Sequence, residues 1–265
     1  MEPALDFSAD PSDVYQPLPA PNIIPYLQRL IGWSEERKLD VVRAADAAEL
    51  ARQRRSHLAL VGSGDLAPVA WSLHRRLMGP ESPFVVVDAR RVVLAPTVRS
   101  PPSRPTLAEG IDAAHGGTVC LRRVPGKRGT PVDWPAHRAR LVREDVRLMI
   151  CYSPEHASDI EFAMHVPVAI PDLATRPDEL GRILDEYIAE AQADFGVTCD
   201  LSPLQRAWVA EHATDHPSLD KILRRILALR TNKRPAAAAR QLGMAQVSLF
   251  RWMRRHGLTR QLMES

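Results

Sequence analysis

The residues best suited to chemistry lie near the C-terminal end, between Lys233 and Leu258. Amide, hydroxyl and guanidinium groups recur there at spacings that place them on one side of a helix. Groups of these types donate hydrogen bonds to base edges and to phosphate oxygens in DNA. The candidate DNA-contacting residues are Lys233, Arg234, Arg240, Gln246, Val247, Ser248, Arg251, Arg254 and Arg255.

Two short helices must position these side chains. The alanine-rich pattern predicts a first helix over residues 236–242, whose small side chains allow close packing. Gly243 supplies the left-handed backbone that a sharp turn between helices needs. A second helix is predicted from about 246 to 256, with Leu249 and Met253 facing inward because they are four residues apart. The elements predict a helix-turn-helix; the plainer alternative is a helical hairpin with a solvated basic face.

Charge is distributed unevenly along the chain. The formal net charge is +3, yet residues 217–265 hold eleven Lys and Arg against two acids, which leaves residues 1–216 at −6. A basic module attached to an acidic body favours neutralisation of phosphates with release of counterions. A solubilising surface is the alternative, but it would not require the charge to be confined to one end.

The stretch ARQLGMAQVSLFRWMRRHGL resembles the Fis-type helix-turn-helix that ends the NtrC-like, enhancer-binding activators of sigma-54 RNA polymerase in bacteria. The residues that match the pattern of that family are Ala239, Leu242, Gly243, Met244, Leu249, Phe250, Arg251, Met253, Gly257 and Leu258. Two positions depart from it. Ala245 replaces the usual N-cap serine, at a cost of roughly 0.5–2 kcal/mol. Val247 is apolar where the family usually carries a polar residue.

The body of the chain resembles the AAA+ ATPase domain of the same family, but its phosphate loop has lost the required chemistry. A predicted strand at His57–Val61 leads into the positions of the Walker A loop: Gly62, Ser63, Gly64, Asp65 and Leu66. The resemblance implies Gly-Lys where this chain has Asp65 and Leu66. A carboxylate repels phosphate, and Leu66 can neither bind nor stabilise transferred charge.

The second nucleotide motif has changed as well. The matching strand is Ala114, His115, Gly116, Gly117, Thr118, Val119, Cys120 and Leu121, after which the resemblance implies Asp-Glu for Mg²⁺ and water. This chain has Arg122 and Arg123 there. Guanidinium groups stay protonated at neutral pH, so they can neither bind Mg²⁺ nor act as a base. We therefore expect a pseudo-ATPase without a catalytic residue, a metal or a cofactor.

The sigma-54 contact is also expected to be absent. Between Arg91 and Ala114 the family inserts a loop tipped with Gly-Ala-Phe-Thr-Gly-Ala, which this chain lacks. Residues 99–105 (RSPPSRP) read as an eroded surface loop or as a stiff basic loop that a partner recognises. Near residues 201–218 neither the family's Trp-Pro-Gly-Asn motif nor its nucleotide-sensing Arg is present.

The resemblance covers residues 56–258 and implies a fold of the α/β class. The expected architecture is a three-layer AAA+ P-loop-like core with a parallel sheet, a helical lid and a C-terminal all-α helix-turn-helix. The expected divisions are a Pro-rich extended or disordered arm (1–25), the degenerate core (26–172), the lid (173–216) and the Fis-type domain (217–265). The arm is alternatively a partner-binding segment.

Apolar spacing predicts the remaining elements. Strands are expected at 83–88 and 145–152, and helices at 26–51, 178–193, 201–214 and 219–229. The last of these has apolar residues on two sides, which suits packing on the lid on one side and on a second copy on the other. The resemblance therefore implies a two-fold homodimer that reads two half-sites.

The cysteines and the lengths of the apolar runs indicate the cellular compartment. Cys120, Cys151 and Cys199 are widely spaced and show no metal or disulfide pattern, so we expect buried thiols in a cytoplasmic protein. No apolar run approaches the length of about 20 residues that spans a membrane, and no signal peptide is recognised.

Two functions of different classes are compatible with the sequence. The first is a sequence-specific, DNA-binding transcriptional regulator whose AAA+-like body serves as a scaffold or partner-binding module. The second is a non-catalytic adaptor or assembly protein that binds another AAA+ or signalling protein through that body. Expected partners are double-stranded DNA, a second copy and a protein partner of the body, but no membrane.

Overall fold

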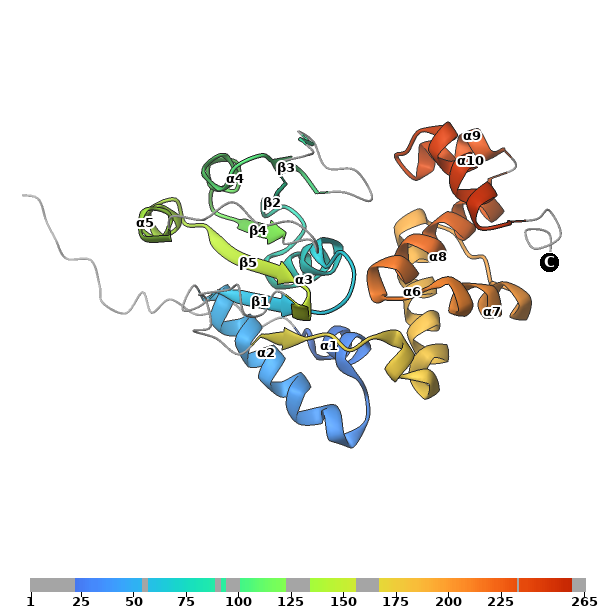
Figure 1. Cartoon of the computed structure of the whole chain (residues 1–265), viewed down its shortest axis with the longest axis horizontal. Helices are drawn as coiled ribbons and strands as arrows, with labels where there is room; N and C mark the ends of the chain where they lie inside the picture. The colour runs from blue at the N-terminus through green and yellow to red at the C-terminus, as the bar shows by residue number, and fades with distance from the viewer. Residues whose placement is uncertain are drawn as a thin grey trace, which may run out of the picture.

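The computed structural model describes residues 22–53, 57–88, 92–93, 101–122, 134–155, 167–232 and 234–258. The chain forms a mixed α/β part followed by an all-helical part, which lie side by side in Figure 1. Nearly all of the predicted N-terminal arm lies outside the described residues, as do residues 99–100 of the loop at 99–105, whereas residues 101–105 are described. No helix in the described ranges is long and apolar enough to cross a membrane.

A parallel sheet of six strands organises the first part. The strands are β1 (Leu58–Val61), β2 (Phe84–Val87), β3 (Ser103–Arg104), β4 (Thr118–Arg122), β5 (Arg147–Tyr152) and β6 (Val168–Ala169). Their order is β3-β2-β4-β5-β1-β6, so β5 lies between β1 and β4. In the register of β5 with its two neighbours, Met149 lies opposite Leu58 of β1 on one side and Cys120 of β4 on the other. This is the predicted α/β class with a P-loop-like core.

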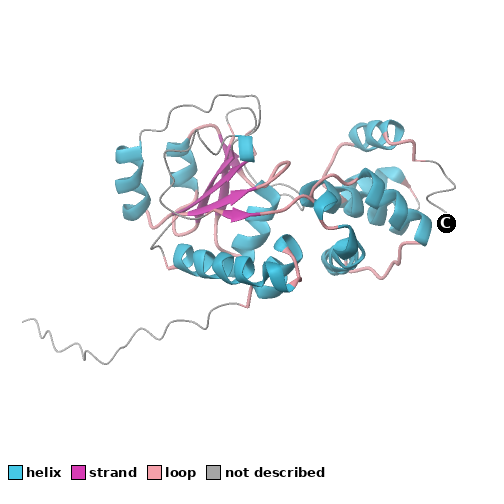
Figure 2. Ribbon diagram, turned by 60° about the horizontal axis from the view of Figure 1, so that its bottom comes forward, coloured by secondary structure: helices cyan, strands magenta, loops and turns pink. Residues whose placement is uncertain are grey.

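Helices cover both faces of the sheet (Figure 2). One face packs on α1 (Ile24–Ile31), α2 (Lys38–Arg52) and α3 (Ala67–Met78), and the other packs on α4 (Leu107–Ala113) and α5 (Trp134–Arg143). Alternate residues of each strand point to opposite faces, so Leu58 and Leu60 join the first core while Ala59 and Val61 contact the second. The three layers follow from this period of two.

The predicted helical region 26–51 is interrupted. Gly32 has a φ of +145°, outside the helical region, and it separates α1 from the short 3-10 turn η1 (Glu35–Arg37) that leads into α2. A Cβ at this position would lie 2.9 Å from Cγ of Arg37. The break is therefore built around a glycine that apolar spacing does not reveal.

The second part is entirely helical. Two 3-10 turns, η3 (Leu173–Thr175) and η4 (Pro177–Glu179), lead into α6 (Leu180–Phe195), α7 (Pro203–His212), α8 (His216–Thr231), α9 (Pro235–Gln241) and α10 (Gln246–Arg255). Ser202 and Asp215 begin α7 and α8 with capping boxes. A single hydrophobic cluster runs from Leu173 to Trp252. The expected lid and DNA-binding segments therefore share one core, without a break in packing at 216–217.

Helix α8 lies inside this shared core, which corrects one sequence prediction. Its apolar residues are Leu219, Ile222, Leu223, Ile226, Leu227 and Leu229, and all of them belong to the cluster or pack against it. Helices α6 and α7, which are the predicted lid helices, contact α8. Helix α9 contacts it as well. The prediction that one apolar side of this helix is left for a second copy is wrong, because α9 and α10 add to the same core.

Candidate nucleic-acid interface

Helices α9 and α10 form the predicted helix-turn-helix. Gly243 has a φ of +61° and directs the chain from α9 into α10. Gly257 has a φ of +58° beyond the end of α10, where the N–H of Leu258 donates to the carbonyl of Met253. Both glycines are therefore used as the sequence predicts. In Figure 1 the pair lies at the end of the helical part, away from the sheet.

The inner face of α10 holds one residue that sequence reasoning missed. Leu249 is buried as predicted and Met253 is half-buried, but Trp252 is buried as well. Its ring meets Trp208 edge to face at 6.4 Å between centroids, and the guanidinium of Arg225 lies 4.7 Å from its centroid. Trp252 lies three residues after Leu249, and that spacing was the available signal.

The outer face of α10 carries the predicted contact residues. Every one of Gln246, Val247, Ser248, Arg251, Arg254 and Arg255 is exposed, and so are Arg234 and Arg240 near α9. Lys233 lies outside the described residues. The structure therefore places eight of the candidates on one helical pair, with their side chains open to solvent.

The beginning of α10 has no side-chain cap. Ala245 occupies the N-cap position with extended backbone, and no side chain there accepts a hydrogen bond. No acidic residue lies in the first turn either. The N–H of Ser248 donates to the carbonyl of Ala245 (2.9 Å), so within the described residues the N–H groups of Gln246 and Val247 are the ones left for an anionic acceptor such as a phosphate oxygen.

Ion pairing distinguishes these arginines from many of those in the rest of the chain. Arg29, Arg122, Arg176 and Arg224 each lie within 3 Å of a carboxylate. Among the described residues, no acid pairs with an arginine of α9 or α10. Their charges are therefore free to be neutralised by an external anion.

The loop predicted as a degenerate phosphate loop is buried only in part, since Gly64 is exposed. Leu66, where the resemblance implies lysine, is buried in the core under the sheet. Asp65 accepts a hydrogen bond from the N–H of Ala67 (3.3 Å), so a carboxylate occupies the start of α3. Gly64 lies against Asp215, whose Oδ2 would be 2.6 Å from a Cβ at that glycine. Two carboxylates at this loop oppose a phosphate electrostatically.

Arg122 connects the end of β4 to the predicted phosphate loop through an ion pair. Arg122, where the resemblance implies the Walker B acid, pairs through Nε with Asp65 (2.8 Å) and through Nη1 with Asp88 (2.8 Å). The arginine thus holds the loop to the ends of β2 and β4. Arg123 lies outside the described residues. Asp65 and Asp88 therefore share one guanidinium.

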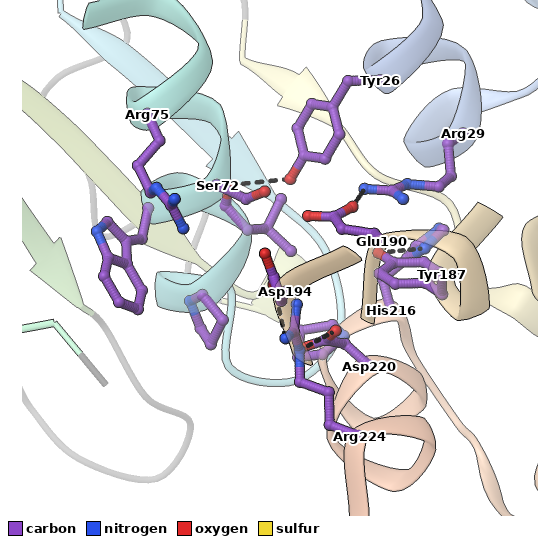
Figure 3. A pocket seen from close by; sticks show the side chains of 14 residues that line it. Tyr26, Arg29, Ser72, Arg75, Tyr187, Glu190, Asp194, His216, Asp220 and Arg224 are labelled. Atoms are coloured by element: carbon purple, nitrogen blue, oxygen red, sulfur yellow. Dashed lines mark hydrogen bonds and ion pairs between the residues drawn. The ribbon is translucent and has the colours of Figure 1, made fainter. Parts of the chain in front are cut away.

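A pocket separates the α/β part from the helices, and Figure 3 shows its lining. Arg29 lies between the rings of Tyr26 (5.0 Å) and Tyr187 (4.2 Å) and pairs with Glu190 at 2.5 Å. Arg224 pairs with Asp194 (2.7 Å) on its other side. At about 70 Å³ the pocket is smaller than the roughly 300–1,000 Å³ of most small-molecule sites. The Arg29–Glu190 pair joins α1 to α6, and the Arg224–Asp194 pair joins α8 to α6.

Arg176 forms a second connection between the two parts. Its Nη1 donates to the carbonyls of Arg29 and Leu30 at the end of α1, both at 2.9 Å. Its Nε donates to Glu179 (2.7 Å), whose other oxygen accepts the N–H of Trp33 (2.8 Å). Burial raises the pKa of Glu179, but these donors outweigh it and hold that pKa below its usual value. Arg176 and Glu179 therefore connect the helical part to the end of α1 and to Trp33, and we call this pair the clamp.

Comparison with known proteins yields little. No protein-family model and no curated protein matches this chain. Among solved structures, the crystal structure of NtrX from Brucella abortus is similar, with 16% sequence identity over 89% of this chain and 71% of that chain and a TM-score of 0.42. Similarity at this level does not establish a shared function.

Proposed function

We propose that this chain is a sequence-specific DNA-binding transcriptional regulator that reads the major groove with α10. One observation carries the proposal: the arginines of α9 and α10 are exposed and without acidic partners in the described residues, on a helix-turn-helix. Phosphate contacts from such arginines supply affinity, and contacts from the first turn of the second helix supply specificity.

Substitution of Arg251 and Arg255 tests the proposal. We expect Arg251→Ala/Arg255→Ala to weaken binding to duplex DNA at least tenfold and to reduce the slope of log K against log salt by about 2, because two phosphate contacts are lost. Fluorescence anisotropy across a salt series measures both. Arg182→Ala/Arg206→Ala removes the same charge from an exposed position of α6 and a half-buried position of α7 and serves as the control.

Selection from random duplexes completes the test. A regulator should enrich a defined site, and two half-sites about one helical turn apart would indicate a two-fold homodimer. Such a dimer needs a surface other than the apolar sides of α8, which are covered. Weak binding without an enriched sequence, unaffected by the double substitution, would contradict DNA binding.

We further propose that the body is a pseudo-ATPase that does not contact sigma-54. The paired charges of Asp65 and Arg122 and the burial of Leu66 support it. We expect labelled ATP with Mg²⁺ to show no saturable binding in a filter assay, because the loop presents carboxylates where phosphates would lie. Saturable binding that excess unlabelled ATP displaces would restore the ATPase hypothesis.

The clamped body also supports the alternative of a non-catalytic adaptor. Arg176 and Arg29 connect the two parts, as a scaffold that presents a fixed surface would require. The two functions differ in where substitutions act: on α10 for a regulator, and on the surface of the α/β part for an adaptor. If selection enriches no site, protein partners of the body become the target.

A further inference from the structure

The outer face of α10 is not uniformly polar. Val247 is 59% exposed and Phe250 is 46% exposed, between arginines that are also exposed. On a helix, Val247 lies four residues before Arg251 and three before Phe250, so the three side chains are neighbours on one side. The apolar pair therefore lies within the surface proposed to contact DNA.

The protein core does not account for these two residues. Leu249 and Trp252 fill the inner side of α10, and Val247 lies on the opposite side. Single exposed apolar residues are common on protein surfaces. Here, however, a valine lies in the first turn of α10, between Gln246 and Ser248, at the turn from which a recognition helix reaches base edges.

We propose that Val247, with Phe250 beside it, contacts the 5-methyl group of thymine, so that the operator carries thymine at a fixed position of each half-site. The inference rests on the proposed DNA binding. Among the groups that a base pair displays in the major groove, the thymine methyl is the apolar one, and it takes apolar side chains as partners. Charge complementarity favours DNA as the occupant, because Arg251, Arg254 and Arg255 surround the pair.

Side-chain stiffness makes Val247 the main determinant. A β-branched residue in a helix has essentially one rotamer, so it loses little freedom on contact. Burial of one methyl group between protein and base corresponds to roughly a fourfold change in affinity. Arg251, one turn later, fixes the helix through phosphate or guanine and does not itself distinguish thymine from uracil.

Replacement of thymine by deoxyuridine, which removes only the methyl group, tests the proposal. In the selected site each thymine is replaced in turn, and binding is measured by anisotropy at one salt concentration. We expect the wild-type protein to bind roughly fourfold more weakly when the contacted thymine is replaced. Val247→Ser should bind both duplexes equally, whereas Val247→Thr, which keeps a methyl group, should retain the preference.

Leu204→Ser is the matched control, since Leu204 is exposed to 54% on α7. It should preserve the preference for thymine. If the wild type binds the selected site but no deoxyuridine weakens it, or if Val247→Ser retains the sensitivity, the proposal is overturned while DNA binding stands. If the wild type shows no salt-dependent binding and enriches no site, the proposed function fails and this inference fails with it.

Discussion

Arg176→Ala should lower the free energy of unfolding by about 3 kcal/mol, as is typical when one partner of a buried ion pair is removed. The guanidinium is buried, it donates to two carbonyls at the end of α1, and it pairs with Glu179. Its loss leaves that carboxylate with fewer donors and leaves the carbonyls of Arg29 and Leu30 without this guanidinium donor. Urea unfolding followed by circular dichroism measures the change.

Arg182→Ala is the appropriate control. Both guanidiniums lie over the ring of Trp33, at 5.6 Å for Arg176 and 4.1 Å for Arg182, but the side chain of Arg182 is 59% exposed. The control should change stability by less than about 0.5 kcal/mol. Arg176→Lys should recover only part of the lost unfolding free energy, because an ammonium cannot reproduce the planar set of N–H donors of a guanidinium. Equal losses for the two alanine variants would show that the clamp is not a stabilising element.

Local patterns predicted the elements well because their causes are local. The strands alternate between two cores, as Leu58 and Leu60 do against Ala59 and Val61, and this period is visible in the sequence. Gly243 was identified because only a left-handed residue joins two helices so closely. The exposure of Arg251 followed from its distance along the helix from Leu249.

Contacts between distant residues were beyond such patterns. Asp65 and Arg122 were each recognised as a loss, yet their pairing depends on β5 placing β4 at a given distance from β1. The role of Arg176 was hidden for the same reason, since its acceptors lie more than a hundred residues earlier in the chain. Asp65 and Arg122, predicted as separate departures from the resemblance, thus form one ion pair in the structure.

The interpretation of α8 was wrong for a related reason. Its two apolar sides were visible in the sequence, but the sequence does not say which neighbour covers each of them. The short connection from Thr231 to Pro235 brings α9 back onto α8, so the chain covers the second side itself. Trp252 adds its ring to the same core.

Acidification should destabilise the protein through two buried histidines. Burial lowers the pKa of His74 to about 4, and burial together with Arg176 and Arg29 lowers the pKa of His216 to about 3. Both rings are neutral in the folded state and bonded there: His74 lies 2.9 Å from Thr118 Oγ1, and His216 lies 3.2 Å from the hydroxyl of Tyr187. An unfolded histidine titrates near about 6.5.

The sign follows from proton linkage. Below about pH 6.5 the unfolded chain binds more protons than the folded chain, so stability is complete above that pH and falls as the pH decreases toward the folded pKa values. Between pH 7 and pH 5 each histidine should cost about 2 kcal/mol of unfolding free energy, and the two together about 4 kcal/mol. Urea titrations at pH 7, 6 and 5 measure this loss.

Single substitutions assign the loss to its source. His74→Gln should be less stable at pH 7, because a bonded ring is removed, but should lose about 2 kcal/mol less than the wild type on going to pH 5. If His74→Gln shows the same loss as the wild type, the buried neutral ring of His74 is not the source, and the carboxylates paired with Arg29 and Arg176 become the groups to examine.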